Sequence, residues 1–121
     1  MAALSIAFEA PDNYSGASPS KHCPIDLVHL AQQTSGDKDL ELEVLHTFAR
    51  QARSCMSELA VGEHDAVCKT AHKLRGAALA IGAFNVSNAA EQVEAHVDAG
   101  HIAVLGAAVI EAENFILKLS R

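Results

Sequence analysis

A histidine beside a glycine, in the middle of a predicted helix, is the feature of this sequence with the clearest chemical potential. The stretch Cys68 to Gly82 reads CKTAHKLRGAALAIG, and Gly76 follows His72 by one helical turn. A glycine inside a helix costs about 1 kcal/mol relative to alanine. Because helical side chains lean toward the N-terminus, a side chain at position 76 would cover the His72 ring. An uncovered imidazole is suited to attack an electrophile such as a phosphoryl group.

Cationic and apolar side chains are predicted around the same imidazole. At about 100° per residue, His72 lies about 140° from the apolar stripe of its helix, on the solvent side. Lys69, Lys73 and Arg75 supply three of the nine basic residues, and the sequence around them holds no acidic residue. We expect these three cations, together with Leu79 on the same outer face, to bind the phosphoryl group or a docking partner.

A carboxylate is predicted to orient the imidazole. If the helices on either side of Ala83 run antiparallel, position 72 faces position 94, which is Glu94. A carboxylate that accepts a hydrogen bond from Nδ1–H leaves the Nε2 lone pair outward as the nucleophile. The expected site is therefore a nucleophilic His72, an orienting Glu94 and the open space at Gly76.

Five helices are predicted to position these side chains, with no sign of strands. Asp26 can cap a short first helix, and Gly36 stands where that helix can end. Apolar residues then recur at steps of three and four through four longer segments. These segments are expected at about 37–62, 64–82, 85–100 and 102–119, with Asn85 as the N-cap of the fourth helix.

The fold class that follows is all-α. Four amphipathic helices with short connections pack most simply as an antiparallel up-down four-helix bundle, with the short first helix as an extra element at the N-terminal side. The expected domain spans 23–121, and 1–22, rich in Pro, Gly and Ser near its end, is expected to be a flexible tail. The apolar residues expected inside the bundle include Phe48, Leu59, Leu74, Ile81, Val93, Val109 and Ile116.

Composition disfavours several classes of function. A chain of 121 residues forms one domain and cannot hold a nucleotide-binding catalytic domain beside it. The net charge of −6 argues against nucleic acid or an anionic membrane as the partner. Three cysteines without C-x-x-C spacing favour a reducing compartment. Without a basic n-region near the start or an apolar run of membrane-spanning length, we expect a cytoplasmic protein.

The stretch AHKLRGAALAIGAFNVSNAAEQVE resembles the histidine phosphotransfer (HPt) family, and the wider similarity runs from Ile25 to Arg121. The hallmark of that family is A-H-x-L-K-G, followed by small residues, L-G and a downstream acidic position. Two positions depart from it, because Arg75 replaces the usual lysine and Ala77 replaces a frequent serine. The positions that match are Ala71, His72, Leu74, Gly76, Gly82 and Glu94.

The resemblance implies a monomeric four-helix bundle that shuttles a phosphoryl group through His72. The donor and acceptor would be receiver-domain aspartates of a hybrid sensor kinase and of a response regulator. It implies a phosphohistidine intermediate without ATP-dependent kinase activity. No cofactor of its own is implied, and Mg²⁺ would be bound by the partner receiver domain.

Two other classes of function stay open at this point. Cys68 and His72 are four residues apart and could place two ligands on one helical face, as in a metal-binding helical bundle, although two further ligands are lacking. A regulatory binding module without phosphotransfer is the other class. The dimerising histidine domain of a sensor kinase is disfavoured, because such domains resemble H-E-x-x-[TN]-P and this chain has H-K-L-R-G.

Overall fold

A computed structural model describes residues 23–120, and this part of the chain is helical without strands. The all-α prediction is confirmed for these residues. The tail expected at 1–22 lies outside them. The helices are α2 (Leu27–Thr34), α3 (Lys38–Val61), α4 (His64–Ile81), α5 (Phe84–Ala95) and α6 (Ala99–Leu119).

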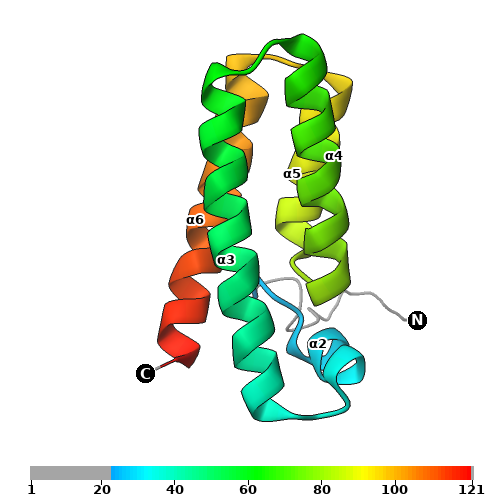
Figure 1. The fold of residues 1–121 in the computed structure, drawn as a ribbon, viewed down its shortest axis with the longest axis vertical. Helices are drawn as coiled ribbons and strands as arrows, with labels where there is room; N and C mark the ends of the chain where they lie inside the picture. The colour runs from blue at the N-terminus through cyan, green and yellow to red at the C-terminus, as the bar shows by residue number, and fades with distance from the viewer. Residues whose placement is uncertain (1–22, 121) are drawn as a thin grey trace, which may run out of the picture.

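The four long helices lie side by side along one axis, and α2 lies at one end of them (Figure 1). Both α4 and α6 pack against α3 and α5, which places α4 and α6 diagonally across the bundle. The apolar stripe of each long helix faces the shared interior. All seven residues predicted for the core are buried: Phe48, Leu59, Leu74, Ile81, Val93, Val109 and Ile116.

The junction between α2 and the end of α4 depends on a glycine. Gly82 ends α4 with φ +86°, a left-handed conformation that favours glycine. A Cβ at this position would lie 2.9 Å from the carbonyl oxygen of Asp26. The Asp26 N–H donates to the Gly82 carbonyl at 2.9 Å, while the Asp26 side chain caps α2 as predicted. Gly82 therefore allows α2 to dock closely against the α4–α5 turn.

The start predicted for the segment 85–100 is wrong by one residue, and its predicted N-cap, Asn85, is wrong. The helix α5 begins at Phe84, and Ala83 occupies the cap position without a side-chain hydrogen bond. Asn85 lies inside the first turn. The N–H of Ala83 instead bonds to the carbonyl of Ala78 at 2.8 Å, so the turn after α4 leads directly into α5.

The boundary between α5 and α6 also differs from the prediction. The helix α5 ends at Ala95, and α6 begins at Ala99 rather than at Ile102. Asp98 determines this start, because its carboxylate accepts a hydrogen bond from the His101 N–H at 2.8 Å. Gly100, the last residue of the segment expected at 85–100, lies in the first turn of α6. Within residues 23–120, none of the helices is long and apolar enough to cross a membrane.

Candidate functional site

His72 lies in the middle of α4 on its outer face. The opposite face of this helix is buried and includes Ala71 and Leu74. Because of this orientation, 66% of the His72 side chain is exposed. The helix fixes the position of the ring while solvent, or a partner, has access to it.

Glu94 reaches the ring from α5. Its Oε1 atom lies 3.0 Å from Nδ1 of His72, and 23% of the Glu94 side chain is exposed. The Arg75 guanidinium also approaches Nδ1, at 3.4 Å. A guanidinium can only donate, so Nδ1 cannot carry a proton for Glu94 and accept from Arg75 at once. We assign the proton to Nδ1 on the shorter contact to the carboxylate, which leaves the Nε2 lone pair free.

Arg75 is engaged within the chain rather than free on the surface. Its Nε atom lies 3.3 Å from Oε2 of Glu94, and Nη1 lies 3.9 Å from Oε2 of Glu91. Among the described residues, Glu94 Oε2 is buried and accepts no aligned hydrogen bond, so its contact with Arg75 is an ion pair without hydrogen-bond geometry. The arginine that was expected to contact a partner therefore forms an ion pair with the carboxylate that contacts His72.

Gly76 leaves open space one turn after His72. Apart from its two neighbours in sequence and the backbone of its own helix, a Cβ built at this glycine would meet no described atom within 4 Å. Close packing between helices therefore does not explain why residue 76 is a glycine. The empty volume lies where a longer side chain would reach back over the imidazole.

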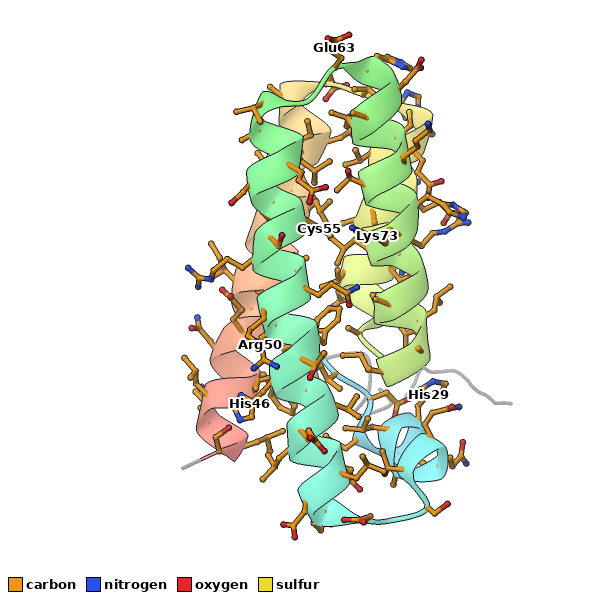
Figure 2. All side chains as sticks on the ribbon, viewed as in Figure 1. His29, His46, Arg50, Cys55, Glu63 and Lys73 are labelled. Carbon is orange, nitrogen blue, oxygen red and sulfur yellow. The ribbon has the colours of Figure 1, made fainter. Side chains whose placement is uncertain are left out.

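The remaining candidate partner-binding residues spread over the outer surface of α4. Lys69 and Lys73 are exposed, and Leu79 is exposed as a large apolar side chain. Lys73 lies on the α3 side of the helix, near Cys55 (Figure 2). Burial raises the pKa of the Cys55 thiol, and the positive charge of Lys73 partly opposes this shift.

The basic side chains near His72 do not point in one direction, although the sequence predicts a single positive surface around this residue. Lys73 lies toward α3, whereas Arg75 lies toward α5 and its carboxylates. Sequence reasoning missed Glu91, the second carboxylate near Arg75. Glu91 could have been found from the sequence, because it lies three residues before Glu94 and therefore on the same face of α5.

The arrangement around Cys68 does not resemble a metal centre. Its Sγ atom lies 3.8 Å from the carbonyl oxygen of Glu94, a weak hydrogen-bond contact. Within residues 23–120, no group of three or more His, Cys, Asp or Glu side chains is placed to hold a metal ion. In the described structure the Cys68 thiol contacts the backbone of α5, whereas the His72 ring faces solvent.

The sequence was compared with the models of known protein families and with known proteins. The sequence model of the Hpt domain matches residues 43–119, which run from α3 to the last residue of α6 and include every residue of the site. No curated protein and no solved structure matches the chain. Because the matched range covers well over half of the sequence and carries the exposed histidine with its carboxylate partner, the chain belongs to the Hpt domain family.

Proposed function

We propose that this protein relays a phosphoryl group through His72. The donor is an aspartyl phosphate on the receiver domain of a hybrid sensor kinase, and the acceptor is the receiver aspartate of a response regulator. The observation that carries this proposal is the 3.0 Å contact between Glu94 and Nδ1 of a histidine whose ring is largely exposed. That contact leaves Nε2 directed outward as the atom that reacts.

The transfer needs no proton to move. The Nε2 lone pair of His72 attacks the phosphorus of the aspartyl phosphate, and the bond from phosphorus to the aspartate oxygen breaks. The aspartate leaves as a carboxylate, and the new N–P bond makes the imidazole ring cationic. Glu94 stabilises this cation through the Nδ1–H hydrogen bond. The reverse sequence delivers the phosphoryl group to a second aspartate.

The other residues of the site act by access and charge. Gly76 leaves the approach to Nε2 unobstructed, so that the incoming phosphorus can align with the attacking atom. Arg75 holds Glu94 through their ion pair and stands near the charge that arrives with the phosphoryl group. Lys69, Lys73 and Leu79 provide charge and apolar contact for the receiver domain.

The scaffold in this proposal is an antiparallel, up-down four-helix bundle of α3 to α6, with α2 as the extra helix at one end. The short connections between successive long helices and their lengthwise packing support this arrangement. One copy of the chain suffices as the relay unit, because His72, Glu94 and Arg75 all belong to it. Mg²⁺ acts on the receiver, and three free cysteines suit a reducing cytoplasm.

The deciding experiment follows labelled phosphate from a receiver to this chain. The protein is incubated with a receiver domain carrying aspartyl phosphate, and the label it acquires is tested for stability. A label that is lost in acid and survives alkali supports phosphohistidine. His72→Gln should acquire none, whereas His64→Gln, which changes an exposed histidine in the first turn of α4, should be labelled like the wild type. Equal labelling of His72→Gln would refute the proposal.

A further inference from the structure

A groove between α5 and α6 extends to the place where residues 1–22 join the described chain. It has two parts, with volumes of about 430 Å³ and about 310 Å³. The two parts are continuous, because Asn85 and Glu111 line both of them. Pro24 lines the second part, so the junction with residues 1–22 lies at that end. This surface is here called the α5–α6 groove, and its lining also includes Ala89, Val104, Ala107, Ala108 and Lys118.

The part of the α5–α6 groove farther from Pro24 exposes apolar side chains. Val104 is 62% exposed, and Ala107 is exposed one helical turn after it. Of the charged residues in the lining, Lys118 belongs to the part near Pro24, and Glu111 lies where the two parts meet. Exposed apolar surface bordered by polar residues is typical of a binding site. The described residues leave this apolar part of the groove uncovered.

Residues 1–22 lie outside the described part of the chain, but their sequence follows the same order of polarity. Residues 2–8 read AALSIAF and carry no charge. Charged residues occur only from Glu9 onward, in a stretch that is rich in Pro, Gly and Ser. Counted away from Pro24, the chain and the groove therefore both change from polar to apolar. We propose that residues 2–8 of this chain cover the apolar part of the α5–α6 groove.

The length of the intervening chain selects this occupant over a second molecule. Val104 and Lys118 are 14 residues apart, which corresponds to about 21 Å along a helix. Residues 9–23 form a link of 15 residues, and a flexible chain of that length spans about 19–23 Å. Because the span matches the distance, the effective concentration of residues 2–8 at the groove is on the order of millimolar. A second copy at lower concentration cannot compete, so the contact agrees with the monomer that the family resemblance implies.

The side chains that gain most from this contact are Leu4, Ile6 and Phe8, the large apolar residues of the segment. The small side chains of Ala107 and Ala108 in the groove leave room for them. Covering the groove removes apolar surface of both partners from water, which stabilises the contact. The segment that the composition predicts to be a flexible tail would therefore have a docked apolar end and a polar link.

The contact leaves the phosphoryl-acceptor site free. Glu94 contacts His72 on the side of α5 that faces α4, whereas the groove lies on the side that faces α6. Since α4 and α6 lie diagonally across the bundle, residues 2–8 would not obstruct the approach to His72. Phosphoryl transfer and this contact can therefore be tested separately.

A tryptophan at position 8 tests the contact in the full chain. The sequence contains no tryptophan, so Phe8→Trp introduces a single reporter in place of another aromatic residue. Its emission should be shifted to shorter wavelength, and acrylamide should quench it several-fold less than free tryptophan, because the groove shields the indole from water. Adding Ala107→Glu should shift the docking equilibrium by about 10-fold toward the uncovered groove, since the apolar contact would bury a charge.

Ala60→Glu is the matched control for Ala107→Glu. It makes the same change at an exposed alanine of α3, outside the lining of the groove. Emission and quenching of Phe8→Trp should therefore stay unchanged when Ala60→Glu is added. Circular dichroism should show the same helix content in both variants, because both alanines are exposed.

Amide signals test the contact without a fluorescent reporter. In spectra of the ¹⁵N-labelled full chain, Ile6→Glu should shift the signals of Ala89, Ala107 and Ala108 and leave that of Ala60 in place. Wild-type signals should be the same at two protein concentrations that differ by about 10-fold, because an intramolecular contact does not depend on concentration.

Three results would overturn the proposal. Groove signals that Ile6→Glu leaves unchanged would show that residues 2–8 do not cover the groove. Emission of Phe8→Trp that Ala107→Glu does not alter would place residue 8 in water or on another surface. Groove signals that move with protein concentration would assign the covering segment to a second molecule. In each case a phosphorylated receiver should still label His72, so none of these results counts against phosphoryl transfer.

Discussion

Replacing Gly76 by glutamine separates the stability of α4 from access to His72. Apart from its two neighbours in sequence and the backbone of its own helix, a Cβ at this position meets no described atom within 4 Å, so the new side chain should cause no steric strain in the fold. Glutamine is a good helix former, and glycine is about 0.8–1 kcal/mol worse than alanine. We therefore expect Gly76→Gln to raise the free energy of unfolding by about 0.5–1 kcal/mol. For a domain of roughly 100 residues this corresponds to an increase of about 2–6 °C in Tm.

The same substitution should strongly impair transfer. A glutamine side chain at this position leans toward the N-terminus of α4 and lies over the ring of His72. A misplacement of about 1 Å between reacting atoms can cost about 100-fold in rate. We expect a loss of this order in the rate of transfer from a phosphorylated receiver, in a protein that is more stable than the wild type.

Two variants control this experiment. Gly76→Ala should gain stability in the same way but obstruct the ring much less, because a methyl group cannot reach it. Ala66→Gln adds the same side chain at an exposed position in the first turn of α4 and should transfer like the wild type. Urea unfolding measures stability, and rapid-quench labelling measures the rate. A stabilised Gly76→Gln that transfers at the wild-type rate would refute the role of the glycine in access.

Four further predictions follow from the fold and the site. Glu94→Ala should slow phosphoryl transfer without abolishing it, and Glu94→Gln should retain more activity because its amide oxygen still accepts from Nδ1–H; single-turnover labelling compares the two. Lys69→Glu should slow association with the receiver and reduce its salt dependence, as measured by stopped-flow, whereas an unchanged rate would remove Lys69 from the docking surface. Leu74→Ala should lower the free energy of unfolding by about 2–5 kcal/mol in urea titrations, since Leu74 is fully buried. Hydrogen bonds from the backbone N–H and the ring of His101 lower the pKa of Asp98. The ionised Asp98 carboxylate therefore stabilises the folded state above about pH 5, and this stabilisation is lost as the pH falls through the lowered pKa. Asp98→Asn should remove this part of the pH dependence of the free energy of unfolding.

The parts of the fold that the sequence predicts are those set by periodicity within one helix. The buried stripes and the outward direction of His72 follow from the 3.6-residue repeat, and the meeting of His72 with Glu94 follows from a short turn centred on Ala83. The boundary between α5 and α6 was misplaced because Gly100 was interpreted as a helix terminator. Asp98 instead accepts a hydrogen bond from the otherwise unpaired N–H of His101, so α6 starts earlier in the sequence, at Ala99.

The electrostatics of the site could not be predicted from one helix alone. The angular position of Arg75 on α4 places it at the edge of the solvent face, which is consistent with a free cation. Its long side chain reaches Glu91 and Glu94 on α5 instead. Such contacts depend on the distance and rotation between two helices, and the periodicity of either helix does not contain that information.

The His72 imidazole, the Glu94 carboxylate, Gly76 and Arg75 all come from α4 and α5, two consecutive helices joined at Gly82 and Ala83. Only 22 residues separate His72 from Glu94. Contacts so close in sequence form with little loss of chain entropy, so this helical hairpin is suited to assemble early during folding. Substitutions on the outer faces of α3 and α6 can then accumulate without rebuilding the acceptor geometry. The outer surfaces of the bundle can therefore change in sequence while the His72–Glu94 geometry stays the same.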